Sequence, residues 1–300
     1  MGTHIIFYIA FNFIIFQLLS LENIEVEQVI NIVCVLAIST IGIAHGAIDH
    51  ILSKSTFKKS DTIFILRYLL AMIFIAIVWF WQPNLGVVLF LLISALHFGQ
   101  TQLIETQFDS KYINYLMQFS WGVIVLSSLL HFNRDIAYDA NESVYGMPPI
   151  LSDIMEWAIY PLIVSSIVLF VLFILGYKRK VISAQGIFME LYLLTLIFLS
   201  GYFLPPLVAF ALFFVLIHSL KAISQEYSYC LENKLVNNIK NFIRKLLPLT
   251  IVSLIGTFII LGLYMWLYGL EDIPILIFVL ISSITVPHTV VMDKFYYRNS

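Results

Sequence analysis

The sequence predicts an all-α protein, a polytopic membrane bundle of about ten transmembrane helices with both termini cytoplasmic. The first observation is composition: 61% of the residues are hydrophobic and 11% are charged, whereas soluble domains have about 45–50% and about 25%. The second is a series of long apolar runs, and the third is the distribution of Lys and Arg. We expect residues 1–300 to form a single integral-membrane domain.

Ten apolar runs are long enough to cross a bilayer, which requires about 20 mostly apolar residues. Charged or proline-containing segments separate them, as expected for breaks between helices. The predicted spans are about 4–20, 29–50, 62–82, 85–104, 113–131, 156–177, 185–203, 205–223, 246–268 and 274–292. The segment at about 224–245 is polar and mixed in charge, and it is expected to be an interfacial or short helical connector on the inner side.

The basic residues support this number of spans and orient them, because cytoplasmic loops carry an excess of Lys and Arg. With a cytoplasmic N-terminus, fifteen of the sixteen basic residues lie on the inner side and only Arg134 lies outside. Removing one span would place the later loops on the opposite side of the membrane, and the basic residues would then be divided between the two sides. The sequence therefore predicts a multi-pass protein of the inner (plasma) membrane, in contact with the lipid bilayer.

The charge and the cysteines exclude other classes of protein. The formal net charge of −2 offers no basic surface for nucleic acid. The two cysteines, Cys34 and Cys230, form no metal-binding pattern and are expected at opposite ends of the membrane. A disulfide between them is therefore not expected.

Four histidines inside the predicted spans form the candidate site, since ionisable groups within a bilayer are functional candidates. They lie about 16, 12, 12 and 14 residues from the outer ends of spans that all run inward. At about 1.5 Å per residue, their depths agree within about 6 Å. The four are His45, His97, His218 and His288.

A shared metal site is one interpretation, because neutral imidazole is the commonest protein ligand for iron, copper, zinc and nickel. Asp49 follows His45 by four residues, so it is expected on the same helical face, where it would accept a hydrogen bond from the imidazole nitrogen that does not bind the metal. Asp293, five residues after His288, is a second such candidate. The alternatives are histidines that only join helices, or a His-lined pathway for a metal ion or proton, which would spread its groups over several depths.

Four short motifs around these histidines resemble those of the Brp/Blh family of integral-membrane β-carotene 15,15′-dioxygenases. The order and spacing agree over essentially the whole chain. The motifs are Gly42-Ile43-Ala44-His45-Gly46-Ala47-Ile48-Asp49-His50, His97-Phe98-Gly99, His218-Ser219 after the aromatic run Phe210 to Phe214, and Val286-Pro287-His288 followed by Asp293.

The resemblance implies a nonheme Fe(II) enzyme that uses O2 to cleave the central double bond of β-carotene into two molecules of retinal. It implies His45, His97 and His218 as iron ligands. The family's usual fourth ligand, a histidine, corresponds to Ala222, and an expected acidic residue corresponds to Gln102. We therefore expect His288 to complete the metal site.

Three functions follow from the sequence. The first is the dioxygenase, with retinal biosynthesis as its role and a retinal-binding rhodopsin as a recipient of the product. The second is a divergent, non-catalytic relative that binds carotenoid or retinal, which the Ala222 substitution favours. The third is the metal or proton transporter.

Overall fold

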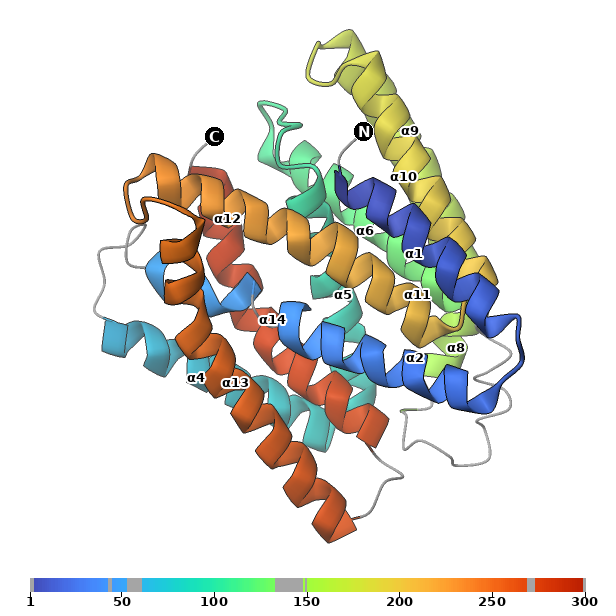
Figure 1. The fold of residues 1–300 in the computed structure, drawn as a ribbon. Coiled ribbons are helices and arrows are strands. Elements are labelled where there is room, and N and C mark those ends of the chain that lie inside the picture. The colour runs from blue at the N-terminus through green and yellow to red at the C-terminus, as the bar shows by residue number, and fades with distance from the viewer. Residues whose placement is uncertain are drawn as a thin grey trace. The chain divides into compact units, whose positions relative to one another are not determined.

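The computed structural model of the chain describes residues 3–42, 45–52, 61–132, 148, 150–268 and 273–298. These ranges are almost entirely helical and contain no strand (Figure 1). The helices are α1 (Thr3–Leu19), α2 (Ile24–Ala37), η1 (Ile38–Gly42), η2 (His45–Ile48), α4 (Asp61–Trp81), α5 (Pro83–Gln102), α6 (Lys111–His131), α8 (Ile150–Trp157), α9 (Ile159–Lys178), α10 (Ala184–Phe203), α11 (Pro206–Leu212), η3 (Phe213–Ser219), α12 (Leu220–Glu232), α13 (Ile239–Tyr268) and α14 (Ile273–Arg298).

Each of the ten predicted spans corresponds to helix, and the predicted fold class is confirmed. Within the described ranges, nine helical segments are long and apolar enough to cross a membrane. The remaining predicted span is α1, a shorter apolar helix of 17 residues. The cytoplasmic location of the termini stays a prediction.

The helices around the predicted polar connector are longer than expected. α12 continues to Glu232 and α13 begins at Ile239, so the segment at about 224–245 is mostly helical. On α12, every fourth residue is buried, namely Ala222, Glu226 and Cys230. The polar residues on the other faces of this helix hid its buried face from the sequence analysis.

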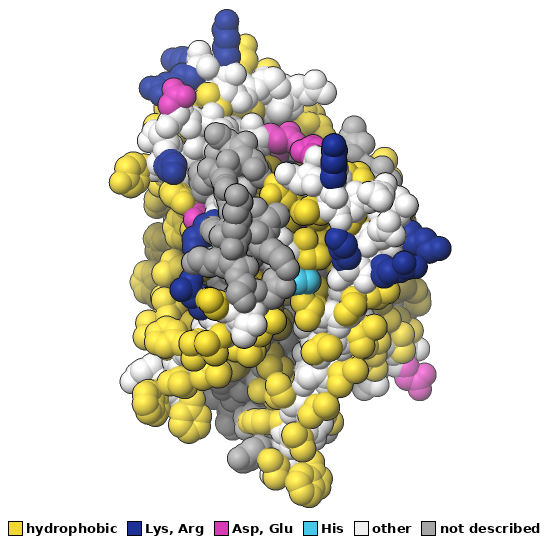
Figure 2. Space-filling view, turned by 90° about the vertical axis from the view of Figure 1, so that its left-hand side faces the viewer, with side chains coloured by type: hydrophobic (Ala, Val, Ile, Leu, Met, Phe, Trp, Pro, Cys, Tyr) yellow, Lys and Arg dark blue, Asp and Glu magenta, His cyan; other side chains and the backbone are white. Residues whose placement is uncertain are grey.

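Large apolar side chains cover much of the surface that Figure 2 draws. Some of them are highly exposed, with Phe80 84% exposed on α4 and Trp266 79% exposed on α13. Such a surface is stable only in an apolar solvent, because a soluble protein rarely exposes apolar patches of this extent. The chain is therefore a polytopic helical membrane protein.

The chain divides into two compact units, each built from segments far apart in the sequence. Unit 1 comprises Met1–Gly42, Ala95–Ala137 and Ser152–Lys221. Unit 2 comprises Ile43–Ser94, Tyr138–Leu151 and Ala222–Ser300. The segments alternate along the chain, so no single cut separates the units, and the sequence shows no linker between them.

In unit 1, α6 packs against α9 and α10, and α11 packs against α2. The core of this unit includes Trp121 of α6, which is only 1% exposed. The π-helical segments η1 and η3 also contact each other. This arrangement brings residues of the first and third motifs together within the unit.

In unit 2, α14 packs against α4 and α13, and η2 packs against α13. The buried Trp79 of α4 donates a hydrogen bond of 2.7 Å from Nε1 to the Ser282 hydroxyl of α14. α4 and α14 are thus joined by a polar contact in addition to apolar packing.

Candidate functional site

Two of the predicted site histidines meet in unit 1. His97 lies on α5 and His218 on η3, and their ring centroids are 4.8 Å apart with the planes inclined by 78°. Both side chains are buried, with exposed fractions of 1% and 3%. Two imidazoles so close together in an apolar interior are suited to bind one metal ion.

The local helix geometry around His218 is unusual. It lies in η3, a seven-residue π-helical segment between α11 and α12. π-Helical turns are rare and occur frequently at functional sites, because the wider turn changes the direction in which a side chain projects. A second π-helical segment, η1, ends three residues before His45. The apolar periodicity of the sequence contains no signal for either segment.

Aromatic rings enclose this histidine pair. The Phe98 ring lies edge-on to His218 at 4.7 Å, and the Phe214 ring stacks on it at 5.5 Å. Gly42 makes room for Phe214, because a Cβ at Gly42 would lie 2.5 Å from a carbon of that ring. The first and third motifs thus contact each other in unit 1 through Gly42 and Phe214, and the rings of Phe98 and Phe214 cover the His218 imidazole.

A close helix crossing holds His97 in place. A Cβ at Gly99 would lie 1.7 Å from the backbone oxygen of Gln118, and one at Gly122 would lie 1.8 Å from that of Ala95. Only glycine allows the backbones of α5 and α6 to approach so closely. Gly99 therefore has a packing role at the crossing of α5 and α6.

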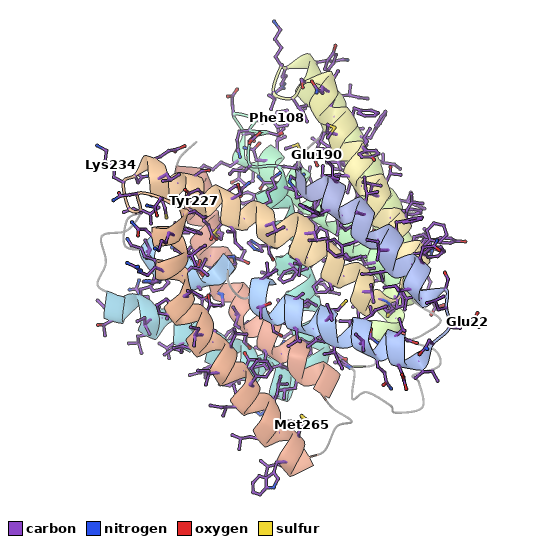
Figure 3. All side chains as sticks on the ribbon, viewed as in Figure 1. Glu22, Phe108, Glu190, Tyr227, Lys234 and Met265 are labelled. Atoms are coloured by element: carbon purple, nitrogen blue, oxygen red, sulfur yellow. The ribbon has the colours of Figure 1, made fainter. Side chains whose placement is uncertain are left out.

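A polar network lies beside this pair in unit 1. Glu190 of α10, labelled in Figure 3, accepts hydrogen bonds from the side chains of Gln102 (2.8 Å) and Trp121 (3.0 Å). Lys221 donates a bond of 2.7 Å to the backbone oxygen of Gln102. A carboxylate is therefore present next to Gln102, but it comes from another helix.

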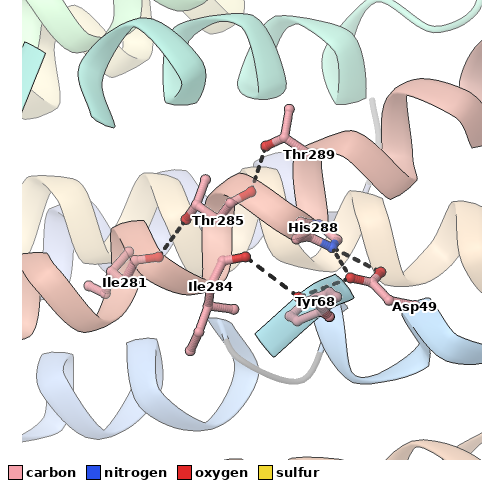
Figure 4. A network of polar contacts seen from close by, with 7 residues as sticks. All are labelled: Asp49, Tyr68, Ile281, Ile284, Thr285, His288 and Thr289. Carbon is pink, nitrogen blue, oxygen red and sulfur yellow. Dashed lines mark hydrogen bonds and ion pairs between the residues drawn. The ribbon is translucent and has the colours of Figure 1, made fainter. Parts of the chain in front are cut away.

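Unit 2 contains the third described site histidine, His288, in a buried hydrogen-bond network (Figure 4). His288 Nδ1 lies 3.0 Å from both carboxylate oxygens of Asp49. The Tyr68 hydroxyl donates to the same carboxylate at 3.1 Å. His288 and Asp49 are each 2% exposed.

Two groups face the Asp49 carboxylate, His288 Nδ1 and the Tyr68 hydroxyl. With Asp49 ionised, its oxygens only accept hydrogen bonds, so Nδ1 of His288 carries a proton and this N–H donates a hydrogen bond to Asp49. The lone pair is then on Nε2, the arrangement in which carboxylate-bound histidines coordinate metals. The backbone of Gly46 lies against this ring, since a Cβ there would be 3.6 Å from Nδ1.

α14 is irregular beside His288. Pro287 lies inside the helix, so it supplies no N–H to the preceding turn. Thr285 and Thr289 donate to backbone oxygens four residues earlier, at 2.8 Å each. Side-chain bonds of this kind often bend a helix.

The structure gives Asp49 a partner that its sequence spacing did not suggest. Asp49 bonds to His288, while the side chain of His45 lies outside the described residues. The shared-face argument assumed an α-helix, whereas the backbone at His45–Ile48 is a 3-10 helix, and the pairing of His45 with Asp49 stays a prediction. Asp293 is half-buried on α14, and its role as a hydrogen-bond acceptor for a metal-binding histidine stays a prediction.

No three His, Cys, Asp or Glu side chains in the described part of the chain lie close enough to hold one metal ion. Within single units, the structure brings together His97 with His218, and His288 with Asp49. The four-histidine set that includes His45 stays a prediction.

Sequence analysis missed three polar residues beside these groups. Tyr68 gave no signal, being one aromatic residue in an apolar span. Glu190 was detectable as the one acidic residue in the apolar run 184–203. Glu226 was assigned to a polar connector, although it is completely buried.

Comparisons with known proteins agree with the resemblance seen in the motifs. The sequence model of the family described as Beta-carotene 15,15′-dioxygenase matches residues 36–296. A protein named Beta-carotene 15,15′-dioxygenase, from uncultured marine bacterium 66A03, is 26% identical over 277 residues, which cover 89% of this chain and 94% of that protein. No solved structure matches.

Proposed function

The chain belongs to the β-carotene 15,15′-dioxygenase family, and we propose that it cleaves the central 15,15′ double bond of β-carotene with O2. The products are two molecules of all-trans-retinal, and each receives one oxygen atom of the O2 molecule. The observation that carries this proposal is the family match over residues 36–296, which includes all four histidine motifs.

We further propose Fe(II) as the cofactor, held by His45, His97, His218 and His288. The donors in the described part of the chain fit this ion: two buried imidazoles in unit 1, and one in unit 2 whose Nδ1 donates to a carboxylate. Imidazole is a good ligand for iron, and a hydrogen bond to a carboxylate fixes the ring and increases its basicity. When bound, Fe(II) supplies the activation of O2, which protein side chains cannot provide.

The chain's own residues then orient the metal-binding histidines and exclude water from them. Asp49 holds the Nδ1 proton of His288, and Tyr68 orients Asp49 from the other side. Phe98 and Phe214 cover the His97–His218 pair with apolar surface. The cleavage needs no general acid or base, and we assign neither role to a residue of the site.

We propose that β-carotene enters laterally from the lipid bilayer of the plasma membrane, because a C40 hydrocarbon dissolves there. Both termini face the cytoplasm in this proposal, and a rhodopsin is a recipient of the retinal. A reporter fused after Ser300 should read cytoplasmic, and one inserted near Asn141 should read external. The reverse reading at either position would refute the orientation and the common depth of the histidines.

Expression in bacteria that accumulate β-carotene tests the cleavage directly. Extracts should contain retinal and less β-carotene than cells with the empty vector. A His97→Ala variant present at the same level in the membrane should form none. If the unaltered protein forms no retinal but binds carotenoid, it is a non-catalytic relative, and if it moves metal ions or protons across vesicles instead, it is a transporter.

A further inference from the structure

Three rings form a stacked column along α11 and η3 in unit 1, and His218 is its last member. The centroids of Phe210 and Phe214 are 5.3 Å apart with the planes inclined by 12°, and those of Phe214 and His218 are 5.5 Å apart with the planes inclined by 21°. Exposure falls along the column, from the half-buried Phe210 to Phe214 at 8% and His218 at 3%. Phe214 therefore covers one face of the buried imidazole.

The first motif fixes the position of Phe214 in this column. Gly42, the last residue of η1, lies beside the Phe214 ring, and a Cβ at Gly42 would be 2.5 Å from Cε1 and 3.2 Å from Cδ1 of that ring. The two π-helical segments, η1 and η3, contact each other. Only glycine, which has no side chain, leaves the Phe214 ring where it is.

The other neighbours of the His218 ring lie at its edges. The Phe98 ring is 4.7 Å from it with the planes inclined by 63°, and the His97 ring is 4.8 Å from it with the planes inclined by 78°. Phe98 also contacts Phe214, at 6.1 Å. The orientation of an imidazole about its last side-chain bond is only weakly restricted by the bond itself. These rings therefore decide the plane in which the nitrogen lone pair of His218 lies.

Resting on the proposed function, we propose that Phe214 is a positioning residue that sets the plane of the His218 ring, and that Gly42 is required because it leaves Phe214 in place. Real Cβ contacts are essentially never under 3.0 Å, so an alanine at position 42 would displace Cε1 of Phe214 by at least 3.0 − 2.5 = 0.5 Å. The ring must then slide or tilt. Either movement changes the surface on which the His218 imidazole lies.

NMR of histidine in the metal-free protein, purified in detergent, tests this inference. The Cε1–H groups of the imidazoles are labelled with 13C, and the His218 signal is the one that His218→Ala removes. A stacked aromatic ring shifts a proton above its face upfield, so Phe214→Leu should move the His218 signal downfield. Gly42→Ala should move it as well. In Gly42→Ala/Phe214→Leu the signal should match that of Phe214→Leu alone, because leucine has no Cε1 for the new Cβ to meet.

The same variants test the consequence for the reaction. Gly42→Ala should lower retinal formation about 10- to 100-fold, the range for loss of a group that orients a metal ligand. Phe214→Leu should lower it about fivefold, the contribution of one aromatic pair. The double variant should recover to the level of Phe214→Leu, because the displaced ring is gone.

Gly86→Ala is the matched control. A Cβ at Gly86 would lie 2.6 Å from the ring of the buried Trp79, so the overlap is similar. Gly86 precedes His97 by 97 − 86 = 11 residues, which is about 16 Å along α5. This variant should leave the His218 signal unchanged.

The inference is wrong if Gly42→Ala leaves the His218 signal at the parent's position, or if Gly86→Ala moves that signal as far. It is also wrong if the signal moves while Gly42→Ala forms retinal at the parent's rate. Should Gly42→Ala not fold, as judged by gel filtration, an unmoved signal in Phe214→Leu refutes the inference in its place. Failure of the proposed function would instead show as a parent protein that forms no retinal, whatever the NMR signals do.

Discussion

Replacing Gly99 with alanine is expected to separate α5 from α6 at the turn that follows His97. The new Cβ would lie 1.7 Å from the backbone oxygen of Gln118, whereas real Cβ contacts are essentially never under 3.0 Å. The two atoms must therefore move apart by at least 3.0 − 1.7 = 1.3 Å. Because the obstacle is backbone, no side-chain rotation relieves the overlap.

The magnitude follows from measured effects of overpacking, which destabilises proteins by about 1–3 kcal/mol and occasionally more. A backbone clash belongs at the upper end of this range, about 3 kcal/mol. Each kcal/mol lowers the midpoint of thermal unfolding by about 2–4 °C, so the midpoint should fall by about 6–12 °C. The assay is thermal unfolding in detergent, followed by intrinsic fluorescence. Retinal formation by the variant should fall as well, because His97 moves with the helix.

Gly256→Ala is the matched control. A Cβ at Gly256 meets no atom of the described residues within 4 Å, and alanine is favoured over glycine inside a helix by about 1 kcal/mol. Its unfolding midpoint should equal or exceed that of the parent. The reasoning is refuted if Gly99→Ala unfolds at the same temperature as Gly256→Ala and forms retinal at the parent's rate.

Two further predictions concern the buried network of unit 2 and its metal. Asp49→Asn removes the charge that holds His288 Nδ1 and should lower the affinity for Fe(II) about 10- to 100-fold. Tyr68→Phe removes one hydrogen bond of about 1 kcal/mol and should lower this affinity about fivefold. Equal losses of affinity in a metal titration would contradict this order. His288→Ala should reduce both iron content and retinal formation, whereas His131→Ala, at the end of α6, should change neither. Full iron and full turnover in His288→Ala would make His288 a packing residue only.

The helical spans were predictable because they depend on local properties of the chain. A run of about 20 apolar residues can satisfy its backbone inside a bilayer only as a helix, whatever surrounds it. For that reason the described residues of each of the ten predicted spans are helical. The helix ends were less predictable, as α12 shows, because packing against other helices buries Glu226 in a segment of polar composition.

The sequence also identified the histidines, since an imidazole in an apolar run is conspicuous wherever the helix packs. It did not identify their partners. Spacing paired Asp49 with His45, whose side chain lies outside the described residues, and gave no sign of the bond to His288, which is 239 residues away in the chain.

By itself, then, the sequence determined the helical membrane architecture, the family motifs and the candidate histidines. Only the tertiary structure decided that His97 meets His218, that Tyr68 and Asp49 orient His288, and that Glu226 is buried. The physical reason is that the length of an apolar run and the rise of a helix are properties of one segment of the chain. The face that a side chain presents and the atom that it bonds depend instead on π-helical turns, a buried proline and glycine crossings between distant segments.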